Sequence, residues 1–197
     1  MNDPSLEIET VRGRMIVAFQ RPQFRNPINS EVISALEKAL ELAMMEGKIE
    51  EIIFTGSGAS FASGADIAEI ERLSEISAVP FAIRGQRFMD NITASAFPTT
   101  AYINGYCYGG GLDLALACRR RFAVPDAAFC HPGARLGIMT GWGGTQRLPR
   151  LIGEGRALEM FLTAEPIDAA EALRIGLIDG IYSDLDSIPK PQETVAL

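Results

Sequence analysis

The chain has 197 residues, of which 47% are hydrophobic and 22% are charged, and its formal net charge is -7. This composition suits one globular domain with a substantial core, and the negative charge argues against binding to nucleic acid. Three cysteines without a CxxC pair argue against a disulfide framework and against a metal site. The polar first residues and the lack of a long apolar run predict a cytoplasmic protein that does not bind a membrane.

The N-terminal part of the chain is expected to form a hairpin followed by a loop. Residues 6–10 and 15–19 have the patterns of two strands, joined at Arg12 and Gly13. The segment 21–27 carries two prolines, which indicate a loop.

A long helix and a buried strand are expected next. Ser30 is the expected N-cap of a helix that reaches about residue 46, with Gly47 as its stop. The apolar run at 51–55 indicates a buried strand. This strand leads into a loop rich in glycine, serine and alanine at 56–64.

Two further helices and a strand follow in the middle of the chain. A short helix is expected from Ala65, and Pro80 is expected to open another helix that ends near Ala96. Residues 99–103 indicate a strand. A short apolar helix is expected over 112–118.

Three consecutive arginines at 119–121 form the densest basic run, and they indicate either an exposed edge or the salt-bridged start of a strand. Strand patterns follow at 121–124 and 127–130. From Gly141 the sequence is first rich in glycine and then helical as far as Leu173.

Strands that alternate with helices predict an α/β layered fold with crossover connections. Nothing in the sequence marks a domain boundary, so we expect a single domain over residues 1–188. Residues 189–197 have two prolines and no periodicity, which predicts a flexible tail.

Two strand–loop–helix junctions are the most informative features of the sequence. The first runs through 56–64 to Ala65, and the second runs through 104–111 to Leu112. A helix start has unpaired N–H groups and a partial positive charge, and glycine lets such a backbone approach a ligand closely. Two such junctions side by side would aim two N–H donors at one oxygen, as an oxyanion hole requires. Either loop alone is better explained as a tight turn, because glycine-rich turns before helices are common, whereas the two together favour a functional site.

Four segments in order resemble the crotonase, or enoyl-CoA hydratase/isomerase, superfamily. They are FTGSGASFASGADI at 54–67, INGYCYGGGLDLALAC at 103–118, GGTQRLPRLIG at 143–153 and AAEALRIGLI at 169–178. The resemblance covers nearly the whole chain and implies a crotonase-like (ββα) spiral core of layered sheets flanked by helices. Members of the family usually continue beyond the last segment, so the resemblance implies a truncated C-terminal helical region.

The resemblance also implies a site for an acyl-CoA thioester. The backbone N–H groups of Ala65 and Gly110 would hold the thioester oxygen, and Arg25 would lie near the CoA nucleotide, although a solvated loop arginine is an equal alternative. Further residues expected near the substrate are Ala62, Gly64, Asp66, Ile67, Tyr108, Gly133, Gly141 and Trp142. No cofactor beyond CoA itself is implied, and the family suggests a homotrimer or a dimer of trimers.

The sequence departs from the family at both catalytic carboxylates. Hydratases that it resembles use two glutamates, which fall at Asp113 and Gly133 here, so one is shortened and the other is missing. Asp113 has only apolar neighbours, which perturbs the pKa of a carboxyl and suits an acid/base residue, but a capping role in the first helical turn is an equal alternative. His131, the one histidine, could replace the missing proton transfer, or it could be structural.

The sequence therefore predicts an acyl-CoA enzyme that stabilises a thioester enolate or oxyanion, similar to enoyl-CoA hydratases and isomerases, with Asp113 and His131 as candidate catalytic residues. Two alternatives stay open. One is a decarboxylase or a thioester hydrolase of the same fold. The other is an inactive CoA-binding or assembly protein that has kept the fold and lost the chemistry.

Overall fold

A computed structural model describes residues 5–46 and 49–191. Its largest sheet has six strands in the order β1-β2-β4-β7-β9-β12. The first pair is antiparallel, in the register of the expected hairpin, and all other neighbours are parallel. These strands are β1 (Leu6–Val11), β2 (Arg14–Phe19), β4 (Glu51–Gly56), β7 (Thr99–Ile103), β9 (Arg120–Ala123) and β12 (Gly180–Ile181).

A second sheet of four strands and a pair of very short strands complete the β structure. The second sheet has the order β11-β10-β8-β5, and the short pair is β3 with β6. The bounds are β5 (Ser60–Ala62), β8 (Tyr106–Tyr108), β10 (Ala128–Cys130), β11 (Ile167–Asp168), β3 (Pro27–Ile28) and β6 (Gly64–Ala65). The expected loop at 56–64 is therefore partly wrong, because β5 and the start of β6 lie within it.

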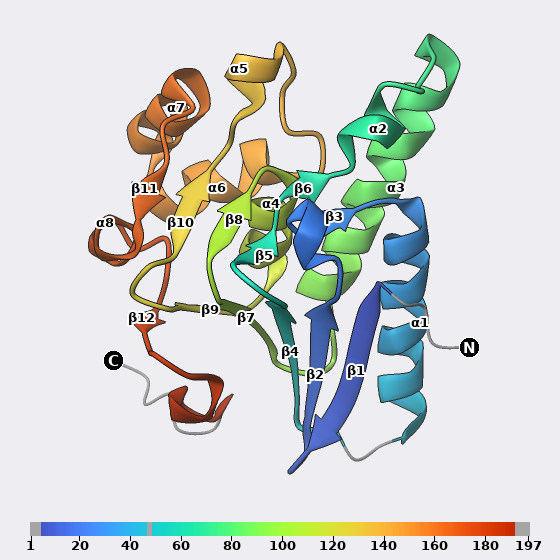
Figure 1. Cartoon of the computed structure of the whole chain (residues 1–197), viewed down its shortest axis with the longest axis vertical. Coiled ribbons are helices and arrows are strands. Elements are labelled where there is room, and N and C mark those ends of the chain that lie inside the picture. The colour runs from blue at the N-terminus through green and yellow to red at the C-terminus, as the bar shows by residue number, and fades with distance from the viewer. Residues whose placement is uncertain (1–4, 47–48, 192–197) are drawn as a thin grey trace.

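The chain alternates between the two larger sheets, as Figure 1 shows. A strand of the six-stranded sheet is followed by a strand of the four-stranded sheet in β4–β5, β7–β8 and β9–β10, and helices follow each pair. This is the (ββα) spiral that was expected. The helices are α1 (Ser30–Glu46), α2 (Ile67–Ile70), α3 (Glu75–Thr93), α4 (Gly110–Ala117), α5 (Gly133–Leu136), α6 (Gly144–Ile152), α7 (Glu154–Thr163) and α8 (Ala169–Arg174), with short 3₁₀ turns η1 (Pro22–Phe24) and η2 (Leu185–Ser187).

Four predicted helix starts are wrong, and in three of them a nearby polar side chain caps the helix better. Asn29, not Ser30, accepts a hydrogen bond from the N–H of Val32 at the start of α1. Asp66 caps α2, which therefore begins at Ile67 and not at Ala65. Ser74 and Ser77 form a capping box, so α3 begins five residues before Pro80 and continues through it to Thr93. Gly47 lies outside the described residues.

Helix α4 lies at the centre of the fold, in contact with strands of all three sheets (Figure 1). Apart from Asp113 it has only apolar residues, and Gly111–Ala117 are all buried, as expected for a helix with no solvent face. It begins at Gly110, two residues earlier than predicted, which places Asp113 in its first turn. No helix in the described part of the chain is long and apolar enough to cross a membrane.

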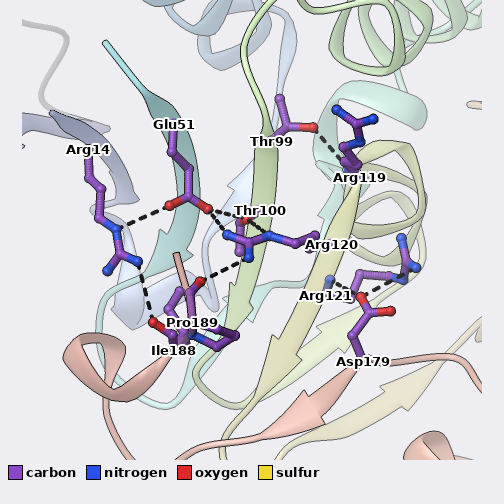
Figure 2. Close-up of polar contacts among 10 residues, drawn as sticks. All are labelled: Arg14, Glu51, Thr99, Thr100, Arg119, Arg120, Arg121, Asp179, Ile188 and Pro189. Carbon is purple, nitrogen blue, oxygen red and sulfur yellow. Dashed lines mark hydrogen bonds and ion pairs between the residues drawn. The ribbon is translucent and has the colours of Figure 1, made fainter. Parts of the chain in front are cut away.

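A buried ion cluster lies on the face of the six-stranded sheet that is away from α4 (Figure 2). Glu51 on β4 is fully buried between Arg14 on β2 and Arg120 on β9. The Nε of Arg14 is 3.1 Å from one carboxylate oxygen, Arg120 donates to the other, and the hydroxyl of Thr100 donates to it at 2.5 Å. The carboxylate of Glu51 is thus bound by side chains from three other strands, β2, β7 and β9.

The same two arginines hold the C-terminal segment against the sheet. Arg14 donates to the carbonyl oxygen of Ile188 at 3.3 Å, and Arg120 donates to that of Pro189 at 2.9 Å (Figure 2). The side chain of Ile188 packs beside them on Ile53. Pro189, the first residue of the predicted flexible tail, is thus bound to the sheet through its carbonyl oxygen. Residues 192–197 of that tail lie outside the described residues.

The basic run at 119–121 is the salt-bridged start of a strand and not an exposed edge. Strand β9 lies between β7 and β12, and Arg120 and Arg121 are both buried. Arg121 is 3.6 Å from Asp179 and also donates to the carbonyl oxygen of Leu177. The side chains of Arg120 and Arg121 are therefore used within the fold, whereas that of Arg119 is exposed.

Candidate active site

The two glycine-rich turns meet, as the sequence predicted. A Cβ placed on Gly64 would lie 2.7 Å from the amide nitrogen of Gly110, and a Cβ placed on Gly110 would lie 3.1 Å from the amide nitrogen of Ala65. Only glycine fits such an approach, and Gly64 also has a φ of +100°. The two turns therefore present their amides to one small region.

Both amides are available to a ligand, but they differ in kind. Gly110 opens α4, so its N–H has no partner within the helix and lies at the positive end of the helix dipole. The N–H of Asp66 donates to Ile28 on β3, and because strand residues alternate in direction, that of Ala65 faces away from β3. Ala65 does not lie at a helix start, so the expected second dipole is absent from this turn.

A cavity of about 240 Å³ lies beside the two amides. Its wall is mainly apolar and holds a few polar groups, as is usual for a ligand site. Eight of the residues singled out from the sequence line it: Ala65, Ile67, Gly110, Asp113, His131, Gly133, Gly141 and Trp142. The wall also includes Phe81, Leu136, Ile138, Met139 and Thr140, among others.

The other five residues singled out from the sequence lie outside this cavity. The guanidinium of Arg25 is 5.9 Å from the ring centre of Tyr106, which packs edge-on against Tyr108. Ala62 is buried and its carbonyl oxygen would lie 2.3 Å from a Cβ on Gly111, so it fixes the position of α4. Gly64 shapes the amide turn described above, and Asp66 caps α2.

Asp113 is a buried carboxylate in the wall of the cavity. Burial raises its pKa from 3.8 to about 6, although the hydroxyl of Thr140, the amides of Trp142 and Gly144 and the charge of Arg147 all oppose the rise. Thr140 donates a hydrogen bond to Oδ2, and Oδ1 has no hydrogen-bond partner. At neutral pH this group is mostly ionised, with one free acceptor oxygen and a pKa close to the working range of a base.

His131 lies beside that free oxygen. Its Nε2 is 3.8 Å from Oδ1 of Asp113, its ring packs on Phe161, and neither ring nitrogen has a hydrogen-bond partner. Burial lowers the pKa of His131 from 6.5 to about 4. The imidazole is therefore neutral at pH 7, so the two side chains do not form an ion pair there.

The position of the missing second glutamate has no room for a side chain. A Cβ placed on Gly133 would lie 2.4 Å from the carbonyl oxygen of Ile138, and the N–H of Ile138 donates to the carbonyl of Gly133. The backbone after α5 has thus closed over this position. A carboxylate could be accommodated only if that backbone moved.

Sequence reasoning missed Thr140, the polar side chain that contacts Asp113 directly. Thr140 lies 27 residues after Asp113 in the chain and follows a stretch of exposed residues. No local pattern therefore connects Thr140 with Asp113. The one available signal was a threonine beside Gly141 and Trp142, which the sequence had already assigned to the pocket.

The chain thus combines a spiral of two alternating sheets with paired backbone amides and a buried carboxylate beside one cavity. Residues 9–192 match the family model described as enoyl-CoA hydratase/isomerase. The chain belongs to this family, which confirms the resemblance and the crotonase-like fold expected from the sequence. It also confirms, at the level of the family, an enzyme similar to enoyl-CoA hydratases and isomerases.

Curated relatives and solved structures agree with this assignment. The chain is 39% identical over 176 residues to crotonyl-CoA hydratase of Syntrophomonas wolfei, covering 89% of this chain and 68% of that one. It is 36% identical to short-chain-enoyl-CoA hydratase of Clostridium acetobutylicum, covering 84% of this chain and 64% of that one. The crystal structure of enoyl-CoA hydratase from Thermoplasma volcanium superposes with a TM-score of 0.88 at 32% identity, covering 92% of this chain and 73% of that one.

Proposed function

We propose that this protein transfers a proton at an enoyl-CoA thioester while the amides of Ala65 and Gly110 stabilise the enolate oxygen. The observation that carries the proposal is the convergence of those two amides beside a cavity whose wall includes Asp113, a carboxylate with one oxygen that has no hydrogen-bond partner. Two donors aimed at one oxygen stabilise charge as it develops, and each is worth about 3–4 kcal/mol in comparable sites.

Migration of a double bond is the reaction that this set of groups supports best. Ionised Asp113 removes a proton from the α carbon of a 3-enoyl thioester, and the electron pair moves onto the thioester oxygen held by the two amides. Protonated Asp113 then returns the proton to the γ carbon as the double bond forms between the α and β carbons. One carboxylate completes this cycle, so the lack of a second one at Gly133 is no obstacle.

Hydration of a 2-enoyl thioester is the second candidate. The relatives with the highest identities quoted above are named as hydratases. Hydration requires water to be activated and positioned, and in this chain His131 would have to take part, since Gly133 carries no carboxylate. The unpartnered ring nitrogens of His131 could orient such a water molecule beside Asp113.

A panel of thioesters distinguishes these possibilities. The protein is incubated with crotonyl-CoA and with a 3-enoyl-CoA in D₂O, and the products are identified by mass spectrometry. Migration gives a 2-enoyl product of unchanged formula apart from deuterium, whereas hydration adds one water. No turnover, with acyl-CoA still raising the melting temperature, would leave a binding protein and overturn the enzymatic proposal.

Asp113→Asn is the matched variant for this assay. It keeps the shape of the side chain and removes the base, so the proposal requires turnover to fall to the background rate. Turnover that survives the substitution would exclude Asp113 as the acid/base residue.

We also propose that the reaction needs no cofactor beyond the CoA carried by the substrate, since Asp113 and the two amides supply both the proton transfer and the charge stabilisation.

Family resemblance supports a homotrimer or a dimer of trimers. Exposed apolar side chains one turn apart on α7, Leu158 at 56% and Leu162 at 66% exposure, agree with a covered surface. Light scattering on the purified protein tests the assembly, and cell fractionation tests the proposed cytoplasmic location.

A further inference from the structure

Asp113 is held by one short segment of the chain, residues 140–144. The hydroxyl of Thr140 donates to Oδ2, and the main-chain amides of Trp142 and Gly144 approach the same carboxylate and favour its charged form. The segment passes so close that a Cβ on Gly144 would lie 2.1 Å from Oδ1. The environment of the carboxylate therefore depends on where this segment lies.

The side chain of Trp142 fixes the segment in place. It is only 2% exposed, and it fills the space between two helices. A Cβ on Gly85 of α3 would lie 2.1 Å from its indole ring, and a Cβ on Gly110 of α4 would lie 2.7 Å from it. Residues 134–139 are exposed, whereas Thr140 is partly buried two residues before this anchor.

Among the side chains near Asp113 in the described part of the chain, that of Thr140 is the one that donates a hydrogen bond to the carboxylate. The other ionisable groups near Asp113 are His131, whose Nε2 is 3.8 Å away, Arg147 of α6, and the buried thiol of Cys107. Arg147 is itself paired with Asp90 at 2.5 Å. None of these three groups constrains the rotation of the carboxylate as a hydrogen bond to one oxygen does.

We propose that Thr140 is a positioning residue for the proton transfer: its hydroxyl holds Oδ2 of Asp113 and so fixes the rotation of the carboxylate, whose other oxygen, Oδ1, has no hydrogen-bond partner. The inference rests on the proposed function and adds to it a residue that lies on a different element from the base. Thr140 acts through Asp113 and not on the substrate.

The hydroxyl has two separable effects. It fixes the rotation of the carboxylate, on which the rate of a proton transfer depends, since small displacements of a reacting group lower the rate strongly. It also stabilises the ionised form, since its hydrogen bond lowers the pKa of Asp113 against the effect of burial. Removal of the hydroxyl should therefore slow the reaction and raise the pKa of the base.

Thr140→Val removes the hydroxyl and keeps the shape of the side chain, and Thr140→Ser restores the hydroxyl. We expect Val to lower kcat about 10- to 100-fold, the equivalent of a lost hydrogen bond to a charged group, with a smaller change in KM. The acidic limb of the kcat–pH profile should move to higher pH, and Ser should recover most of the rate. Thr163→Val, which removes an exposed hydroxyl bonded to the carbonyl of Glu159, is the control and should leave kcat and the profile unchanged.

A direct titration of Asp113 by carboxyl ¹³C NMR separates this inference from the proposed function. If the wild-type protein turns over no thioester, the proposed function fails, but the titration still reports whether Thr140 holds the carboxylate. A higher pKa in Thr140→Val than in the wild type and in Thr140→Ser supports the inference. An unchanged pKa, or a Val variant with the kcat and pH profile of the wild type, overturns it.

Discussion

Asp113→Asn should make the protein more stable at neutral pH while it abolishes turnover. Burial of the carboxyl raises its pKa from 3.8 to about 6, so the folded state resists ionisation that the unfolded chain undergoes freely. A pKa difference of about two units, at about 1.4 kcal/mol each, corresponds to about 3 kcal/mol. Asparagine is never ionised, and its oxygen can still accept the hydrogen bond from Thr140.

Because the folded pKa of Asp113 is raised, the difference in free energy of unfolding between the two proteins should depend on pH. A carboxyl whose folded pKa is raised contributes stability that is fully present below about pH 4 and is lost as the pH rises through about 6. The free energy of unfolding of Asp113→Asn, minus that of the wild type, should thus be near zero at about pH 4. It should rise to about 3 kcal/mol above pH 7.

Urea unfolding of both proteins across this pH range measures the difference. The subtraction at each pH is essential because the folded pKa of His131 is lowered from 6.5 to about 4, so its contribution rises with pH where that of Asp113 falls. Asp126→Asn, at an exposed position, is the control and should give no pH-dependent difference. A flat difference for Asp113→Asn, or one that becomes unfavourable at high pH, would refute the reasoning.

Three further substitutions test other parts of the structure. Glu51→Gln leaves two arginines without their carboxylate, so it should lower the free energy of unfolding, measured by urea titration, by about 3–5 kcal/mol. The control Glu41→Gln, at an exposed position, should change it by less than about 0.5 kcal/mol. Gly110→Ala should lower kcat about 10²- to 10³-fold, because the added methyl meets both Trp142 and the Ala65 amide; an unchanged kcat would exclude this turn from the oxyanion hole. Gly133→Glu should not create or raise hydratase activity, and it should lower stability by about 1–3 kcal/mol through contact with the backbone of Ile138; a gain in hydration would contradict the crowding seen at this position.

Much of the fold follows from local patterns in the sequence, whereas the details of the site depend on contacts between distant segments. The hairpin, the central apolar helix and the two glycine-rich turns were predicted because periodicity and glycine spacing are local signals. The start of α3 was predicted too late because Pro80 was a stronger signal than the serine capping box before it. The caps Asn29 and Asp66 were also missed, because the predicted helix boundaries were placed at the neighbouring residues Ser30 and Ala65.

The site could be predicted as a set of residues but not as an arrangement. Asp113 was identified because a carboxylate among apolar residues is unusual in any sequence. Its contact with Thr140 joins two elements far apart in the chain, and the closed backbone at Gly133 depends on the path taken after α5. The burial of Arg120 also depended on strand order, which places β9 inside the sheet and not at its edge.

The attachment of the C-terminal segment to the sheet has a consequence for tolerance to mutation. Arg14 and Arg120 bind carbonyl oxygens at residues 188 and 189, and every amino acid has a carbonyl oxygen. This part of the attachment therefore recognises the main chain and is indifferent to side-chain identity. Substitutions at 189 should therefore be tolerated. A substitution at Glu51 should release the segment, because it removes the carboxylate that keeps both arginines in place.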